Sequence, residues 1–246
     1  MIAGSMVSTP LDIPLARAPR ERSIYTWAAL AALFFVFAGF ARTYYLKAAF
    51  GAPDLSALKH LHGLVMTAWF VFFFVQVRLV ATGRTAVHRR LGVAGVFLAL
   101  LVLVVGTALG IASARAGAAP TGVAPLVFLV LPIGEMLVFA VLVTAAILMR
   151  KRGPYHKRLM LLASVAMLTP AMARLPFDFV QAGGPLAFFA LTDAVILACI
   201  AFDTLKNRRL HPVFGAGLAF IVVGQIGRLA FSQTAAWMTF AKWLVA

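Results

Sequence analysis

The chain has 246 residues, of which 63% are hydrophobic and only 12% are charged, whereas an average globular chain carries about 25% charged residues. Its net charge of +15 would suit a nucleic acid partner, but the Lys and Arg residues lie between apolar runs, where they set membrane topology and meet anionic lipid headgroups. Composition therefore excludes a nucleic-acid-binding domain and predicts one polytopic membrane domain.

The sequence predicts a cytoplasmic tail over residues 1–23 and a transmembrane domain over residues 24–246. The tail is polar, and the apolar run behind it is longer than the core of a cleaved signal peptide. Seven apolar runs reach the length of about 20 residues that a helix needs to cross a bilayer. They are Ile24–Tyr45, Ala57–Ala81, Leu91–Ala114, Ala124–Met149, Leu159–Phe179, Pro185–Leu205 and Val213–Phe231. Polar and apolar residues do not alternate as in a β-barrel, so we predict an all-α fold of seven transmembrane helices.

The basic residues predict how these helices are oriented. Fifteen of the 22 Lys and Arg residues lie in the tail, in the last turn of the second run (Arg78) or in the connections after the second, fourth and sixth runs. The positive-inside rule assigns these segments to the cytoplasm. The N-terminus is then inside and the C-terminus outside, as an odd number of spans requires.

Several polar residues fall inside the predicted spans, in the half nearer the outer face. Glu135, Asp193, Arg174 and Arg228 come from four different helices, and Gln225 lies one turn from Arg228. An unpaired charge in the membrane is costly, so these groups are expected to pair across the bundle. Two interpretations stay open: a ligand pocket open to the outer side, or two structural ion pairs without a ligand.

Two histidines, His60 and His62, begin the second predicted helix at the outer face. One of them could line the mouth of the pocket. On a regular helix, residues two apart point in nearly opposite directions, so the two rings could share a metal ion only if the helix began after them. A His-x-His segment in an extended loop would suit copper or zinc.

Two other histidines lie in similar short motifs at the inner side. Val87–Leu91 reads V-H-R-R-L and Tyr155–Leu159 reads Y-H-K-R-L, either because of an old duplication or because both are basic caps at the membrane interface. His88 and His156 would then lie at one depth on two helices, where their imidazoles could hold a b-type heme with arginines near its propionates.

These motifs also carry a resemblance. The stretch His60–Gly92 contains H-L-H-G and H-R-R-L-G, and P-Y-H-K-R-L-M-L-L-A begins at residue 154. It resembles bacterial multi-pass membrane proteins from families of unknown function. These families share a His-Arg-x-x-Gly step, which is matched here by His88, Arg89 and Gly92. A more distant similarity to cytochrome b561-type proteins implies heme. The resemblance implies the bacterial inner membrane as the location.

The leading functional prediction is a membrane protein that binds a cofactor or small ligand in the outer polar pocket and is linked to redox or respiratory chemistry. Glu135 and Asp193 would handle protons or cations, and Arg174 and Arg228 would balance them or bind an anion. The alternatives are a proton-coupled carrier of small solutes and a structural subunit that joins a partner in a larger membrane complex. The predicted cofactor is heme b, with a metal ion as the second choice.

Overall fold

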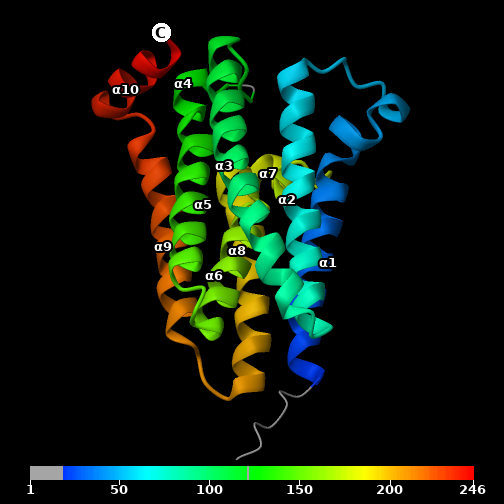
Figure 1. Cartoon of the computed structure of the whole chain (residues 1–246). Helices are drawn as coiled ribbons and strands as arrows, with labels where there is room; N and C mark the ends of the chain where they lie inside the picture. The colour runs from blue at the N-terminus through cyan, green and yellow to red at the C-terminus, as the bar shows by residue number, and fades with distance from the viewer. Residues whose placement is uncertain (1–18, 121) are drawn as a thin grey trace, which may run out of the picture.

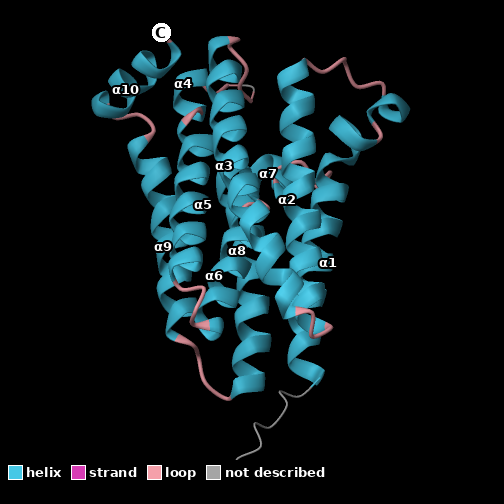
Figure 2. Ribbon diagram, in the orientation of Figure 1, coloured by secondary structure: helices cyan, strands magenta, loops and turns pink. Residues whose placement is uncertain are grey.

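The computed structural model describes residues 19–120 and 122–246, with side chains from Ile24 onward. The prediction for the cytoplasmic tail falls mostly on residues 1–18, which lie outside the described residues. Within the described ranges, every regular element is a helix and none is a strand (Figure 2). The all-α prediction is therefore confirmed.

Among the described residues, six helical segments are long and apolar enough to cross a membrane, and they mark the chain as an integral membrane protein. In chain order the bundle helices are α1 (Pro19–Phe40, continued by the π-helical η1, Ala41–Tyr45), α2 (Ala57–Ala81), α3 (Thr85–Arg115), α4 (Pro125–Phe128) with α5 (Val130–Leu148), α8 (Asp178–Asn207) and α9 (Pro212–Phe231). A short 3-10 turn, η2 (Lys47–Phe50), precedes α2. Large apolar side chains on these helices, such as Phe97, Val104 and Leu148, are exposed, as expected of surfaces that face lipid.

The fifth predicted span differs from the prediction because it is broken. It consists of α6 (Gly153–Ala166) and α7 (Thr169–Met172), and neither reaches span length. Pro170 explains the break, since proline has no N–H for the carbonyl four residues earlier and its ring crowds that carbonyl. The carbonyl oxygen of Ala166 accepts a hydrogen bond from the Thr169 hydroxyl instead (2.9 Å).

The broken element is the inner part of the bundle. The continuous helices contact one another in a closed ring, in the order α1, α2, α3, α5, α9, α8 and back to α1, while α6 and α7 pack against α1, α5, α8 and α9 (Figure 1). Nearly all side chains from Arg158 to Met172 are buried. A helix that is apolar on all sides belongs in such a core, and its length matters less because its neighbours shield its backbone from lipid.

The last helix, α10 (Ala235–Val245), does not extend α9 but turns back across one end of the bundle (Figure 1). Its Trp237 donates from Nε1 to the carbonyl of Leu126 (2.8 Å), and Arg115 at the end of α3 donates from Nε to the carbonyl of Val245 (2.9 Å). We refer to this end as the α10 end. The described chain begins at the opposite end (Figure 1).

Candidate functional site

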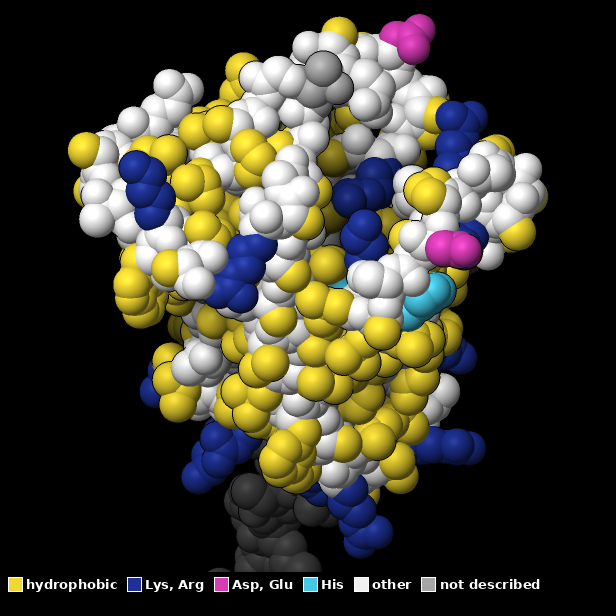
Figure 3. Space-filling model, turned by 90° about the horizontal axis from the view of Figure 1, so that it is seen from above, with side chains coloured by type: hydrophobic (Ala, Val, Ile, Leu, Met, Phe, Trp, Pro, Cys, Tyr) yellow, Lys and Arg dark blue, Asp and Glu magenta, His cyan; other side chains and the backbone are white. Residues whose placement is uncertain are grey.

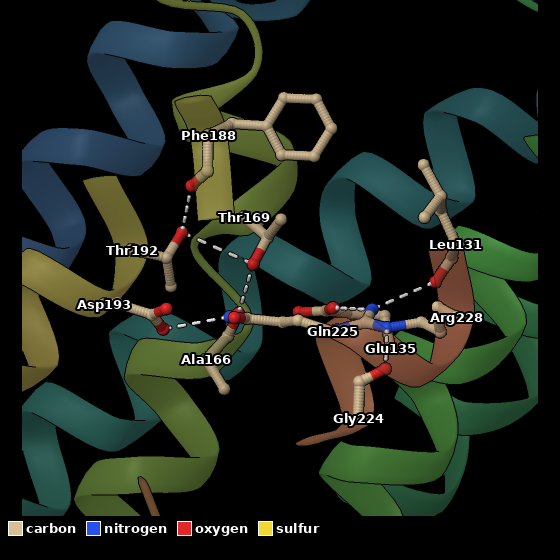
Figure 4. Close-up of polar contacts among 10 residues, drawn as sticks. All are labelled: Leu131, Glu135, Ala166, Thr169, Phe188, Thr192, Asp193, Gly224, Gln225 and Arg228. Carbon is tan, nitrogen blue, oxygen red and sulfur yellow. Dashed lines mark hydrogen bonds and ion pairs between the residues drawn. The ribbon is translucent and has the colours of Figure 1, made fainter. Parts of the chain in front are cut away.

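The first part of the candidate site is a buried ion pair between α5 and α9, toward the α10 end. Arg228 Nη1 lies 2.6 Å from Glu135 Oε2, and both side chains are less than 10% exposed. Arg228 also donates from Nε to the carbonyl of Gly224 (3.1 Å) and from Nη1 to that of Leu131 (3.3 Å) (Figure 4). Gly134 leaves room for this arginine, because a Cβ there would collide with Arg228 Cδ. The pair therefore depends on contacts that fix its geometry.

A second polar pair lies beside the first. Gln225 precedes Arg228 by three residues, so both side chains leave α9 on the same face. Gln225 donates from Nε2 to Asp193 Oδ1 on α8 (2.9 Å). The neighbouring residue, Thr192, is fully buried and donates to the hydroxyl of Thr169 at a distance of 3.4 Å (Figure 4). Polar groups from α5, α7, α8 and α9 thus gather next to the break in the inner helix.

One oxygen of this cluster has no partner. Glu135 accepts from Arg228 with Oε2, but its Oε1 is buried and receives no hydrogen bond from any described residue. The Thr169 hydroxyl lies close to this carboxylate but donates its proton to the carbonyl of Ala166. Leaving a buried acceptor unsatisfied costs about 1–3 kcal/mol. Such an atom has lone pairs that can take a proton, a cation or a donor group of a ligand.

The remaining predicted pocket residues lie apart from this cluster. Arg174 follows α7 and is exposed, with its guanidinium 4.7 Å from the centre of the Phe40 ring on α1. The positive charge of Arg174 acts on the imidazole of His62. The ring of His60 packs against Tyr44 at 5.9 Å between centres, and its side chain is exposed. The four residues Glu135, Arg228, Asp193 and Gln225 therefore form one group, and Arg174 and His62 form another.

The predicted metal site at His60 and His62 depended on where the second helix begins. The structure starts α2 at Ala57 and caps it with the Ser56 side chain, which accepts from the N–H of Lys59. Both histidines are therefore helical and cannot converge on one ion. Among the described residues, no group of three or more His, Cys, Asp or Glu side chains is arranged to hold a metal ion.

The two motif histidines come together at the opposite end of the bundle. His88 in the first turn of α3 and His156 in the first turn of α6 have ring centres 6.2 Å apart, with ring planes at 72°. Nδ1 of His156 lies 2.8 Å from the carbonyl oxygen of Ala146. Nδ1 of His88 is buried and has no hydrogen-bond partner among the described residues.

Sequence analysis missed a second buried ion pair, also at this opposite end. Asp203 Oδ2 accepts from Arg158 Nη2 (2.6 Å) and Nε (3.0 Å), and Oδ1 accepts from the Tyr25 hydroxyl (3.0 Å). The available signal was Asp203 itself, an acid within the sixth predicted span. Its partner was overlooked because Arg158 was placed in a cytoplasmic connection.

Together these features define an integral membrane protein with two buried ion pairs, one toward each end of its bundle. Comparisons with protein families, with curated proteins and with solved structures found no match to this chain.

Proposed function

We propose that the chain crosses the bacterial inner membrane seven times, with its N-terminus in the cytoplasm and its C-terminus outside. The six continuous helices supply six crossings, and α6 with α7 supplies the seventh inside their ring. The positions of the chain ends support an odd number of crossings, because the described chain starts at one end of the bundle and finishes at the other (Figure 1). The α10 end is then the outer end.

The function that the geometry supports best is that of a membrane redox protein with a b-type heme held between His88 and His156. The carrying observation is the spacing of the two rings, whose centres lie 6.2 Å apart. Imidazole nitrogens bind a metal ion at about 2 Å, so two rings on opposite sides of one ion have centres roughly 6 Å apart.

The protonation pattern of the two rings supports the same proposal. A carbonyl oxygen can only accept, so His156 donates from Nδ1 to Ala146 and keeps the lone pair of Nε2 for a ligand. Metal-binding histidines commonly donate their other ring nitrogen to a carbonyl in this way. His88 offers the unpartnered Nδ1, and Arg89, Arg90 and Arg152 at the same end could meet the propionates. When bound, the heme supplies one-electron transfer, and this chain's residues supply the ligands and the charge balance.

In this proposal, the group formed by Glu135, Arg228, Asp193 and Gln225 is a site where protons are taken up and released. Glu135 and Asp193 would exchange protons with the outer side, while Arg228 and Gln225 balance them. The unpartnered Oε1 of Glu135 is the atom best suited to take up a proton.

The test is an absorption spectrum and an iron assay of the protein purified after expression with heme supply. We expect a Soret band that shifts on reduction, and its loss in His88→Ala and in His156→Ala. His211→Ala, at the same end of the bundle, and His60→Ala serve as matched controls that keep the band. Added imidazole should restore the band in His156→Gly. A wild-type protein that is colourless and free of iron would defeat the proposal.

A second candidate function, a proton-coupled carrier, is favoured by a different observation. A buried acid with a free oxygen lies beside a broken helix, and secondary transporters build their substrate and ion sites at such discontinuous helices. Proteoliposomes loaded with a pH-sensitive dye would be challenged with mixtures of amino acids and of monocarboxylates. A carrier acidifies the lumen only with a solute that it transports, and Glu135→Gln abolishes this while Asn207→Ala, at the far end of α8, does not. No solute-dependent acidification in the wild type would reject this function.

A further inference from the structure

Arg174 is a strongly basic side chain that forms no ion pair with any residue the structure describes. Arg174 follows α7 in the chain, and α7 lies deeper in the bundle than the upper ends of α2 and α3 (Figure 1). Seen from the α10 end, the molecule is hollowed, and Lys and Arg side chains lie inside the hollow (Figure 3). Arg174 is exposed, and its neighbours come from three elements, namely Phe40 of α1, Pro170 of α7 and His62 of α2.

The acids toward this end are engaged elsewhere or lie in the open. Glu135 pairs with Arg228, Asp193 accepts from Gln225, and Asp54 pairs with Lys47 in an exposed loop. Asp178, in the first turn of α8, is exposed and forms no ion pair with a described residue. In the part of the chain that the structure describes, Arg174 makes one hydrogen bond, from Nη1 to the carbonyl of Pro170 (2.8 Å), and no ion pair. Because Arg174 is exposed and has no counter-charge among the described residues, an anion from outside the chain can pair with it.

The turn that carries Arg174 is held in place by a side chain from the next helix. Gln181 on α8 donates from Nε2 to the carbonyls of Ala173 (3.3 Å) and Leu175 (3.2 Å), the residues on either side of Arg174. The aromatic face of Phe40 fixes the plane of the guanidinium. The group is thus positioned before any ligand arrives, which lowers the entropy cost of binding.

We propose that Arg174, with His62 beside it, binds the oxyanion group of a phosphate or carboxylate ligand in the hollow at the α10 end. A guanidinium presents a planar fork of N–H donors that matches two oxygens of such a group. Nη1 is engaged with Pro170, which leaves the other donors for the ligand. Exposed cations toward the same end, Arg42 and Lys59, raise the local concentration of anions.

The ligand can come from solution or from the lipid, and the experiment separates these sources. The probes are inorganic phosphate and phosphatidylglycerol. In one arm the protein is reconstituted in phosphatidylcholine nanodiscs, and phosphate binding is measured by calorimetry, with chloride at equal ionic strength as the reference. In the other arm, native mass spectrometry counts the phosphatidylglycerol molecules that stay bound after purification.

We expect Arg174→Gln to weaken binding in the responding arm by about tenfold or more, because a charge-assisted hydrogen-bond pair is lost. Arg174→Lys should recover only part of it. Gln181→Ala should weaken it less while leaving the thermal unfolding temperature nearly unchanged. Lys242→Gln, an exposed cation on α10, is the matched control and should change binding less than threefold.

Phosphate binding in phosphatidylcholine assigns a soluble anion, whereas retained phosphatidylglycerol that is lost in Arg174→Gln assigns a lipid headgroup. Absence of both, or binding that Arg174→Gln leaves unchanged, overturns the proposal. None of these outcomes depends on the heme spectrum, so this inference and the proposed redox function succeed or fail separately.

Discussion

The two buried ion pairs of this protein have the same length but differ in how completely they are satisfied. Glu135–Arg228 and Arg158–Asp203 both have a closest distance of 2.6 Å, and all four side chains are less than 10% exposed. At the end opposite α10, both oxygens of Asp203 accept hydrogen bonds. At the α10 end, Oε1 of Glu135 accepts none from the described residues.

This difference separates a structural role from a functional one. A buried charge pair whose remaining atoms are all hydrogen-bonded is fixed in one state, because any change of charge leaves groups unsatisfied. Asp203 fits that description, and it connects α1, α6 and α8 through Tyr25 and Arg158. In the Glu135 pair, Oε1 remains an unused acceptor next to the helix break, so it can bind a proton or a ligand.

The largest expected effect tests the structural pair. Arg158→Met leaves Asp203 buried without its counter-ion, which costs about 3–5 kcal/mol. The double variant Arg158→Met/Asp203→Leu removes both charges and should recover most of that loss. Unfolding with increasing SDS in mixed micelles measures both. Equal losses in the single and double variants would mean that the two charges are not coupled in the membrane.

Glu135→Gln should cost less. Arg228 keeps its bonds to the carbonyls of Gly224 and Leu131, and the new amide oxygen at position 135 can still accept from Nη1, so the loss is about 2 kcal/mol. The same SDS titration gives the value. If it equals or exceeds the loss in Arg158→Met, the two pairs are equally structural and the comparison between them fails.

Gly134→Ala tests whether the position of Arg228 matters without changing any charge. The new methyl group would collide with the arginine side chain, and overpacking of this kind costs about 1–3 kcal/mol. Gly215→Ala on α9 is the control, because a Cβ there meets open space. The control should be neutral or slightly stabilising, by up to about 1 kcal/mol, since alanine favours the helix. Equal changes in stability for the two variants would show that the contact with Arg228 does not restrict the size of the side chain at position 134.

Much of the fold could be predicted from the sequence, because membrane helices are specified by the length of an apolar run. Six of the predicted runs are continuous helices, or helices with a short interruption, in the structure. The fifth run, Leu159–Phe179, carried a proline signal at Pro170, but composition alone does not say whether proline bends a helix or breaks it. That depends on tertiary partners, here the Thr169 hydroxyl that takes over the carbonyl of Ala166.

The candidate sites were harder to predict because charged residues extend helices beyond the apolar run. The runs start at Leu91 and Leu159, but α3 begins at Thr85 and α6 at Gly153. This extension places Arg158 inside a helix, one to two turns from its start, where it can reach Asp203. Its long side chain keeps the charge away from lipid. An assignment that ends helices at the first cation cannot find such a pair.

The smallest expected effect concerns the hydroxyl contact between α7 and α8. Thr192→Val keeps the shape of the side chain but removes its hydroxyl, which donates to the carbonyl of Phe188 within α8 (2.9 Å) and lies 3.4 Å from the Thr169 hydroxyl. Hydrogen bonds between membrane helices contribute about 0.6 kcal/mol on average. Thr204→Val on the same helix is the control, because the Thr204 hydroxyl is buried without a partner among the residues described. Thr204→Val should be neutral or stabilising. If Thr192→Val also proves neutral, the contact contributes nothing to stability, and the break in the inner helix is held by packing and by Pro170 alone.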